Sequence, residues 1–397
     1  MKISSVICEY NPFHNGHKLM LEYMRKNGAT HIVACMSGNF TQRGDFAVFN
    51  KWQRTKTALL NGADLVVELP VSFSCATAER FALGGVYILN ALGCVDEICF
   101  GSECGNVEIL RKACDAVTDS EISDTIKNHC SCGMTFAAAR EKAVCDIYGK
   151  EISDILAQPN NILAVEYLKA LKRLDSTITP TTIARIGVNH DSNQTSDEIA
   201  SASFVRQLLY DRNDEYLKYI PENTFDTVNT ALSSLPDCQR LKKLENAVLY
   251  RMRTMNKDDF ANLPDISEGL ENRLLSAVKG SVSYDELMQA VKCKRYTLAR
   301  IRRCILHAFL GITKQNSPAL PPYIRVLGFN GNGREILRIM RKSANIPVIM
   351  RYADVGILSE ECQITFDFES RCDDIFFLSE KNILKCGKNY TENIVRI

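Results

Sequence analysis

Two histidines flank a glycine near the start of the chain, in the segment His14-Asn15-Gly16-His17. A pair of imidazoles can donate hydrogen bonds to the oxygens of a nucleoside triphosphate and stabilise the charge that grows as pyrophosphate leaves. Gly16 allows a close approach of backbone to ligand, and the following helix is expected to offer free N–H groups and its positive dipole end to phosphate. The competing interpretation is that the histidines cap the helix or lie on its surface. Their pairing around a glycine, directly after an apolar run, favours nucleotidyl-transfer chemistry.

A serine and arginine motif lies much later in the chain, in Ser201-Ala202-Ser203-Phe204-Val205-Arg206. Ser201 or Ser203 can cap the next helix and bind phosphate, while Arg206 supplies a fixed cation one turn later. A plain N-cap is the alternative for the two serines. Although the two motifs lie far apart in the sequence, both suit one phosphate site.

Short apolar runs alternate with helix-period segments over the first two hundred residues, as parallel strands buried on both faces and their crossover helices should. The predicted strands are residues 3–8, 31–36, 63–69 and 95–101. The predicted helices are residues 17–27, 51–61 and 76–92. Right-handed crossovers then give an α/β fold with a Rossmann-like, doubly wound parallel sheet, whose ligand site lies at the carboxyl ends of the strands. The turn with the two histidines follows the first strand and is expected at that edge.

The composition limits the remaining classes of protein. With 397 residues the chain can form two or three domains, and its net charge of +1 means that any nucleic-acid surface must be local. The N-terminus lacks the apolar core of a signal peptide, and no run of about 18 apolar residues predicts a membrane helix. The 16 cysteines include no C-x-x-C pair and lie mostly in apolar runs. We therefore expect a cytoplasmic protein with reduced thiols and no metal site.

The character of the sequence changes after about residue 215. Residues 216–316 are predicted to be helical, and a proline-rich segment then marks the start of an α+β region at 317–397. That last region is predicted to contain a strand at 323–329 and a helix at 334–342. The predicted division of the chain is therefore 1–215, 216–316 and 317–397.

Two segments are candidates for RNA contact. Residues 292–303 carry six basic residues and no acidic one, which predicts a basic helix along RNA phosphates, with Tyr296 able to stack on an unpaired base. The loop at 37–49 is longer than a strand-to-helix connection needs, so Gln42 and its neighbours are candidates for phosphate or RNA contact. A solvated helix face and an ordinary solvated loop are the respective alternatives. The predicted RNA-contacting residues are Arg43, Lys51, Lys294, Arg295, Arg300, Arg302 and Arg303.

The histidine segment resembles the His-x-Gly-His signature of the nucleotidylyltransferase and class I aminoacyl-tRNA synthetase superfamily, and residues 201–206 resemble its serine and arginine motif. Further segments narrow the resemblance, along essentially the whole chain, to the tRNA(Met) cytidine acetate ligase family. These segments are residues 9–17 (EYNPFHNGH), 37–44 (SGNFTQRG), 61–70 (NGADLVVELP), 100–103 (FGSE), 159–163 (PNNIL) and 294–297 (KRYT).

The resemblance implies an ATP-dependent ligase that activates acetate as acetyl-adenylate and acetylates the wobble cytidine of elongator tRNA(Met) to N4-acetylcytidine. It implies ATP as a substrate, accompanied by Mg²⁺, a catalytic domain at 1–215 and tRNA binding at 216–316. His14 and His17 are the implied catalytic residues. The implied nucleotide-binding residues are Ile7, Cys8, Glu9, Tyr10, Asn11, Pro12, Phe13, His14, Asn15, Gly16, His17, Lys18, Leu19, Met20, Gly101, Asn160, Asn161, Arg185, Ser201, Ser203 and Arg206.

Several alternatives stay open for these residues and for the function. Gly101 has an ordinary turn glycine as its alternative, and either Asn160 or Asn161 can start the next helix instead of touching nucleotide. Arg185 lies in a predicted strand, where a buried charge needs an anion that a protein carboxylate supplies as well as a nucleotide does. Two other functions compete with the ligase: a small-molecule nucleotidylyltransferase and a non-catalytic RNA-binding relative.

Overall fold

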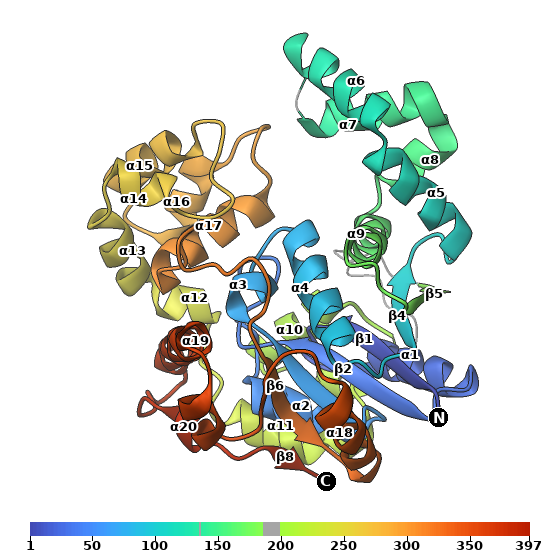
Figure 1. Ribbon diagram of the computed structural model, residues 1–397. Coiled ribbons are helices and arrows are strands. Elements are labelled where there is room, and N and C mark those ends of the chain that lie inside the picture. The colour runs from blue at the N-terminus through green and yellow to red at the C-terminus, as the bar shows by residue number, and fades with distance from the viewer. Residues whose placement is uncertain (135, 186–198) are drawn as a thin grey trace.

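The computed structural model describes residues 1–134, 136–185 and 199–397, which are built around one β-sheet (Figure 1). The described strands number eight and follow the order β5-β4-β1-β2-β3-β6-β7, with β8 paired to β6. The first five are β1 (Ile3–Cys8), β2 (His31–Ser37), β3 (Leu65–Leu69), β4 (Glu97–Ser102) and β5 (Thr179–Ala184). All neighbours among β1 to β5 pair in parallel. The predicted parallel sheet is therefore confirmed for these strands.

Helices cover both faces of this sheet, which explains why every residue of β1, β2 and β3 is buried. On one face lie α1 (Asn15–Lys26) and α2 (Lys51–Leu60), and on the other lie α4 (Ala78–Ala91) and α9 (Pro159–Arg173). Successive residues of β2 alternate between the two cores: Ile32 packs under α1 and α2, whereas Val33 packs under α4. The predicted helices at 17–27, 51–61 and 76–92 correspond to α1, α2 and α4.

The C-terminal region extends the same sheet instead of forming a separate one. Strand β6 (Ile324–Phe329) pairs antiparallel with β3, and both β7 (Val348–Ile349) and β8 (Val395–Arg396) pair in parallel with β6. The remaining elements here are α18 (Gly331–Ser343), η3 (Tyr352–Ile357), α19 (Glu360–Leu378) and α20 (Lys388–Thr391). The strand and helix predicted at 323–329 and 334–342 are confirmed as β6 and α18. The sheet is mixed, however, because β6 runs against β3.

Two groups of helices lie at either side of the carboxyl edge of the sheet (Figure 1). The first group follows β4 and consists of α5 (Val107–Thr118), α6 (Ser120–Ser131), α7 (Phe136–Tyr148) and α8 (Lys150–Ile155). The second group is α12 (Arg240–Lys243), α13 (Glu245–Arg253), α14 (Lys257–Ala261), α15 (Leu270–Gly280), α16 (Tyr284–Val291) and α17 (Leu298–Leu310). The short α3 (Val71–Ser74), α10 (Ala202–Tyr210), η1 (Asp214–Lys218), η2 (Glu222–Thr224) and α11 (Phe225–Leu232) complete the described helices. None of these helices has the length and apolarity needed to cross a bilayer.

A fully buried lysine joins the N-terminal and C-terminal parts of the sheet. The Nζ of Lys51, at the start of α2, lies 2.6 Å from Oε1 of Glu68 in β3 and 2.7 Å from Oδ2 of Asp373 in α19. On the other side of Glu68, Nε of Arg325 in β6 lies 3.5 Å from Oε2. Glu369, one turn before Asp373, accepts a 2.7 Å hydrogen bond from the N–H of Val71. We refer to Lys51, Glu68, Arg325, Glu369 and Asp373 as the buried ion cluster.

The surroundings of Glu369 increase its affinity for a proton. Burial raises the pKa of Glu369 well above its ordinary value, and the charges of Glu68 and Asp373 add to this, with Lys51 opposing them. The folded state therefore favours the neutral acid more than the unfolded chain does.

Lys51→Met should destabilise the protein by about 3 to 5 kcal/mol, because it leaves Asp373 buried without its cation and Glu68 with Arg325 alone. Denaturant unfolding followed by circular dichroism measures this change. Lys56, exposed on the same helix, provides the matched control, and Lys56→Met should change the free energy of unfolding by less than about 0.5 kcal/mol. Equal effects of the two substitutions would contradict the role given to the cluster.

The raised pKa of Glu369 predicts a pH dependence of stability. Above the pKa of a glutamate in the unfolded chain, the unfolded state loses this proton while the folded state keeps it. Stability is therefore greatest below that value and falls as pH rises, by up to about 1.4 kcal/mol per pH unit, until the folded pKa is passed. Glu369→Gln keeps an acceptor for the Val71 N–H and removes the titration. Unfolding curves at several pH values above the pKa of an unfolded-chain glutamate should show a shallower loss of stability for this variant, and parallel curves would disprove the assignment.

Candidate functional site

The turn between β1 and α1 brings two imidazole rings together at the carboxyl edge of the sheet. His14 is the N-cap of α1, and its Nδ1 accepts a 3.1 Å hydrogen bond from the N–H of Gly16. The Nδ1 of His17 accepts a 3.3 Å bond from the N–H of His14, so the two side chains form a reciprocal capping box. Their rings stack with centroids 3.7 Å apart, and Tyr10 contacts His17 edge-on at 4.9 Å. The predicted capping and the predicted pairing are both present.

These backbone bonds determine the tautomer of each ring. A backbone N–H can only donate, so each Nδ1 must be the unprotonated acceptor. The neutral rings of His14 and His17 therefore both carry their proton on Nε2. Two Nε2–H donors on stacked rings can hydrogen-bond neighbouring oxygens of a phosphate chain.

The first N–H groups of α1 are already used, contrary to the prediction that they are free for phosphate. The N–H of Asn15 donates to the carbonyl of Tyr219 at 2.8 Å, and that of Gly16 donates to the His14 ring. The N–H of His17 donates to the carbonyl of His14 at 2.9 Å. The imidazoles, and not the helix N-terminus, are therefore the donors that this turn offers to a ligand.

Arg206 reaches the same turn from α10. Ser201 is the N-cap of α10, and its Oγ accepts from the N–H of Phe204 at 3.2 Å and lies 2.9 Å from Oγ of Ser203. One turn later, Nη1 of Arg206 donates a 2.7 Å bond to the carbonyl of Asn11. The structure therefore joins the serine and arginine motif to the histidine turn, as predicted, and the plain N-cap is also present.

Three arginines, Arg43, Arg185 and Arg206, lie close enough at this edge to affect one another's charge. Burial lowers the pKa of Arg206, and the charge of Arg43 lowers it further, against the opposing effect of Asp45 and Glu9. Burial likewise lowers the pKa of Arg185, again with a contribution from Arg43. Arg43 therefore repels both other guanidinium groups, and an anion bound among them would relieve that repulsion.

Arg185 belongs to a polar cluster at the ends of β4 and β5. Its Nη1 donates to Oδ1 of Asn160 at 3.0 Å, and Nδ2 of Asn160 donates to Oε1 of Glu103 at 2.6 Å. Asn161 is 1% exposed and accepts from the N–H of Glu103 at 3.0 Å. Asn160 thus has partners for both its side-chain groups, whereas Nδ2 of Asn161 is buried without a partner among the described residues. A Cβ added to Gly101 would lie 3.2 Å from Cγ of Arg185, so the glycine allows the arginine to cross the strand end.

Two details of this cluster correct the predictions. Arg185 lies just beyond β5, which ends at Ala184, and the rest of the predicted strand at 186–187 lies outside the described residues. Helix α9 begins at Pro159 with Gln158 as its N-cap, so Asn160 and Asn161 lie in its first turn, as the alternative for them expected, but do not cap it. Within the other predicted nucleotide-binding segment, Ile7 and Cys8 are buried inside β1, whereas Lys18 and Leu19 are exposed on α1.

Residues 38–50, between β2 and α2, form a packed loop, so the alternative of a solvated loop is wrong. Phe40 and Phe46 are 1% and 2% exposed and bridge across the loop. The N–H of Gln42 donates to Oε1 of Glu9 at 2.7 Å. At the tip, Gly44 has a φ of 78°, and an added Cβ would lie 2.4 Å from the backbone nitrogen of Arg303, so the tip packs against α17.

Lys51 is removed from the RNA-contacting set because it is fully buried in the ion cluster. Arg300 and Arg303 are removed because acidic residues before α15 pair with them: Nη1 of Arg300 lies 3.2 Å from Glu268, and Nη2 of Arg303 lies 2.6 Å from Asp265. These cations have protein partners and stabilise the fold.

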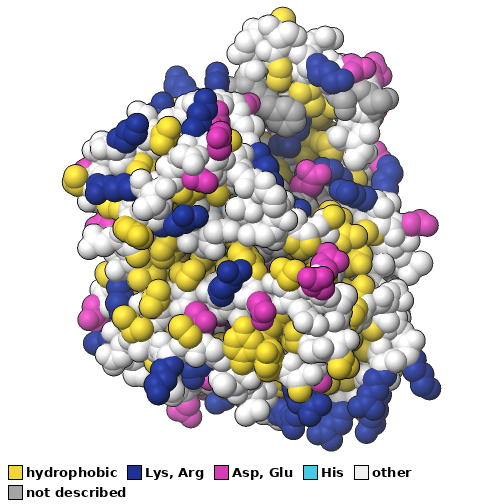
Figure 2. Space-filling view, turned by 60° about the vertical axis from the view of Figure 1, so that its left-hand side comes forward, with side chains coloured by type: hydrophobic (Ala, Val, Ile, Leu, Met, Phe, Trp, Pro, Cys, Tyr) yellow, Lys and Arg dark blue, Asp and Glu magenta, His cyan; other side chains and the backbone are white. Residues whose placement is uncertain are grey.

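The predicted basic helix at 292–303 is also wrong in its first half, since α16 ends at Val291 and α17 begins at Leu298. Tyr296 is 6% exposed and donates to the carbonyl of Glu268 at 2.7 Å, so its ring is not available for stacking. Lys294, Arg295 and Arg302 are exposed and form no ion pair among the described residues. In the view of Figure 2, Lys and Arg side chains gather at the lower right of the molecule, and elsewhere on this face they lie among acidic and uncharged side chains.

The sequence analysis missed Arg54 and Glu103. Arg54 is 1% exposed and lies three residues after Lys51, on the same face of α2 as the buried Ala58. Two cations on an otherwise apolar helix face were the signal that could have found it. Glu103 directly follows β4, at the edge where ligand sites of parallel sheets lie.

Paired imidazoles at the end of the first strand of a parallel sheet, with an arginine motif brought to the same turn, define a nucleotidyltransferase of the His-x-Gly-His type. The family model described as HIGH Nucleotidyl Transferase matches residues 1–390. Among solved structures, ligand-free Thermotoga maritima TmcAL (apo, form I) has a TM-score of 0.95 and 30% identity, with 100% of both chains covered. The same protein bound with alpha-thio ATP (form II) has a TM-score of 0.92 and 30% identity over 100% of both chains.

The names of the curated relatives define a narrower family than the nucleotidyltransferase model does. The chain is 39% identical to the tRNA(Met) cytidine acetate ligase of Thermoanaerobacter sp. (strain X514), over 100% of both chains. It is 36% identical to the ligase of that name from Acetivibrio thermocellus, again over 100% of both chains. The chain belongs to the tRNA(Met) cytidine acetate ligase family.

Proposed function

We propose that the protein is an ATP-dependent ligase that activates acetate as acetyl-adenylate and acetylates the wobble cytidine of elongator tRNA(Met) at N4. The observation that carries the chemistry is the placing of the stacked His14 and His17 rings and of Arg206, through its bond to the carbonyl of Asn11, on one turn at the carboxyl edge of the sheet. Full-length similarity to tRNA(Met) cytidine acetate ligases supports the choice of acetate and tRNA over other substrates.

In the first half-reaction, an acetate oxygen attacks the α-phosphorus of ATP and the bond to the β-phosphate oxygen breaks, releasing pyrophosphate. The Nε2–H groups of His14 and His17 would donate to the phosphate oxygens whose negative charge increases. Arg206 and Arg185 would hold the nucleotide with charge-assisted bonds, together with residues 7–20, Gly101, the Asn160-Asn161 pair, Ser201 and Ser203.

In the second half-reaction, N4 of cytidine attacks the acetyl carbon, AMP leaves and the nitrogen loses a proton. The adenylate provides a good leaving group, and a site closed to water protects it from hydrolysis. No acylated side chain is required.

Mg²⁺ is proposed only as the ion that accompanies ATP. Among the described residues, no three His, Cys, Asp or Glu side chains are grouped so that they could hold a metal ion. The ion would therefore be held mainly by phosphate oxygens and water, as is usual for Mg²⁺ with nucleotides. A tRNA substrate and 16 free thiols suit the cytoplasm.

As functional regions we propose residues 1–215 for adenylation, 216–316 for tRNA binding and 317–397 as the support of the sheet. The exposed Lys294, Arg295 and Arg302 are the proposed RNA contacts of the second region, and Arg43 remains a candidate for phosphate or RNA contact. The deciding experiment is ATP–pyrophosphate exchange with and without acetate, followed by nucleoside analysis of tRNA. A small-molecule nucleotidylyltransferase would not depend on acetate, and a non-catalytic relative would show no exchange.

His14→Ala and His17→Ala should each lower acetate-dependent pyrophosphate exchange by about 100- to 1,000-fold, the usual effect of losing one preorganised donor. Transfer from supplied acetyl-adenylate to tRNA should fall much less, because pyrophosphate does not leave in that step. Each variant also loses one of the two side chains of the capping box of α1, so its unfolding curve must be measured beside its rates. Equal losses in both half-reactions of a folded variant would rule out a role specific to adenylation.

Replacing Lys294, Arg295 and Arg302 together with alanine should weaken tRNA binding and reduce the slope of log affinity against log salt by about 2 to 3. Acetate-dependent exchange should be unchanged. The matched control replaces Arg334, Arg338 and Arg341, which are exposed on α18. That helix starts at the amino edge of the sheet, where the side chain of Asn330 contacts Asp64. A loss of affinity in the control and not in the test variant would move the RNA surface to α18.

A further inference from the structure

Arg54 is a fully buried arginine whose partners are backbone carbonyls. Its Nε donates to the carbonyl of Phe49 at 3.0 Å, and its Nη1 donates to the carbonyls of Glu9 at 2.5 Å and Ser37 at 3.1 Å. Its Nη2 donates to the carbonyl of Gly38. The side chain is 1% exposed and forms no ion pair with a carboxylate among the described residues. Burial lowers its pKa to about 10, so it remains charged at neutral pH.

These four carbonyls belong to the segments that form the floor of the candidate site. Glu9 directly follows β1, Ser37 ends β2, Gly38 begins the packed loop 38–50, and Phe49 lies near its end. One planar guanidinium therefore binds the ends of two neighbouring strands and both ends of the loop that carries Arg43. A lysine ammonium group lacks the planar set of N–H donors that binds all four carbonyls at once.

The carbonyl of Glu9 leads directly into the histidine turn. The next residue, Tyr10, has a φ of 47°, a left-handed conformation that a residue with a side chain rarely adopts. Its ring then packs against Phe13 at 4.8 Å and His17 at 4.9 Å. The direction in which the chain leaves β1 thus determines where the imidazoles lie, and the Arg54 bond to Glu9 fixes that direction.

We propose that Arg54 is a positioning residue for adenylation: by holding the carbonyl of Glu9 against the loop 38–50, it sets the place of His14 and His17 relative to the phosphates. This inference rests on the proposed function. It adds a residue that does not contact the nucleotide but determines whether the imidazole donors meet the transition state.

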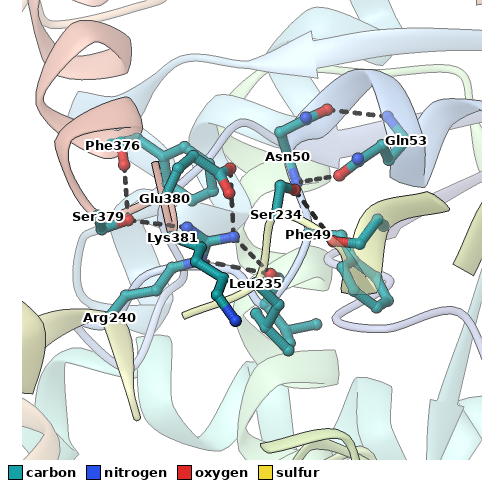
Figure 3. A network of polar contacts seen from close by, with 12 residues as sticks. Phe49, Asn50, Gln53, Ser234, Leu235, Arg240, Phe376, Ser379, Glu380 and Lys381 are labelled. Carbon is teal, nitrogen blue, oxygen red and sulfur yellow. Dashed lines mark hydrogen bonds and ion pairs between the residues drawn. The ribbon is translucent and has the colours of Figure 1, made fainter. Parts of the chain in front are cut away.

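The test compares Arg54→Lys with a matched control, Arg240→Lys. Arg240 is also 1% exposed and also donates to the same loop, through the carbonyl of Val48 at 2.9 Å. Its other partners, Oγ of Ser379 at 2.8 Å and Oε1 of Glu380 at 3.3 Å, lie at the end of α19 in the C-terminal region (Figure 3). Both substitutions keep a buried positive charge and remove a planar guanidinium group, so they should lower the unfolding midpoint by similar amounts.

Acetate-dependent pyrophosphate exchange is measured for both variants at a temperature where each is folded. Arg54→Lys should lower kcat by about 100-fold with little change in KM for ATP, because displaced donors weaken the transition state more than nucleotide binding. Arg240→Lys should keep kcat close to that of the wild type. If the wild type itself shows no acetate-dependent exchange, that result contradicts the proposed function. It does not contradict the role of Arg54.

A wild-type kcat in Arg54→Lys, or an equal loss in Arg240→Lys, would overturn the proposal. If Arg54→Lys does not fold, Arg54→Gln serves in its place, because a neutral planar amide is less costly to bury and still donates to carbonyls. Failure of both variants to fold, with Arg240→Lys folded, would make Arg54 a residue of stability only and would also overturn the proposal.

Discussion

The burial of Lys51 is the constraint on which the arrangement of the molecule depends. A lysine with no access to water is tolerated only if carboxylates meet it, and Glu68 and Asp373 do so at 2.6 and 2.7 Å. One carboxylate comes from the parallel sheet and the other from α19, near the end of the chain. The nucleotidyltransferase sheet is therefore not complete without the C-terminal region, whose strand β6 covers the edge of β3.

Buried cations also join distant segments around the loop 38–50, but there they bind backbone carbonyls. Arg54 holds it to the ends of β1 and β2, Arg240 holds it to the C-terminal region, and the tip at Gly44 packs on α17. All three parts of the chain thus meet on one loop, beside the histidine turn. If bound RNA displaced α17, this loop would move first, because tightly packed elements transmit small shifts.

Much of the fold could be predicted because strands buried on both faces are recognisable as continuous apolar runs, and β1 to β4 lie where those runs lie. The antiparallel pairing of β6 with β3 could not be predicted, since register between residues about 260 positions apart leaves no local pattern. For the same reason the basic run at 292–303 was misleading. The acidic partners of Arg300 and Arg303, Asp265 and Glu268, lie outside the run and have no spacing relation to it.

The site could be predicted where chemistry and position coincide, at motifs that directly follow buried strands, and not where a residue acts through the backbone. Arg43, Arg185 and Arg206 could be predicted from the sequence as site residues, whereas Arg54, which acts through the backbone, could not. The charge of Arg43 repels the guanidinium groups of Arg185 and Arg206, whereas nearby carboxylates attract them. Arg185 and Arg206 are held by their bonds to Asn160 and Asn11, and Arg54 binds both ends of the loop that carries Arg43. A bound anion would relieve the repulsion from Arg43, so the packing that brings these cations together would also raise the affinity for the anion.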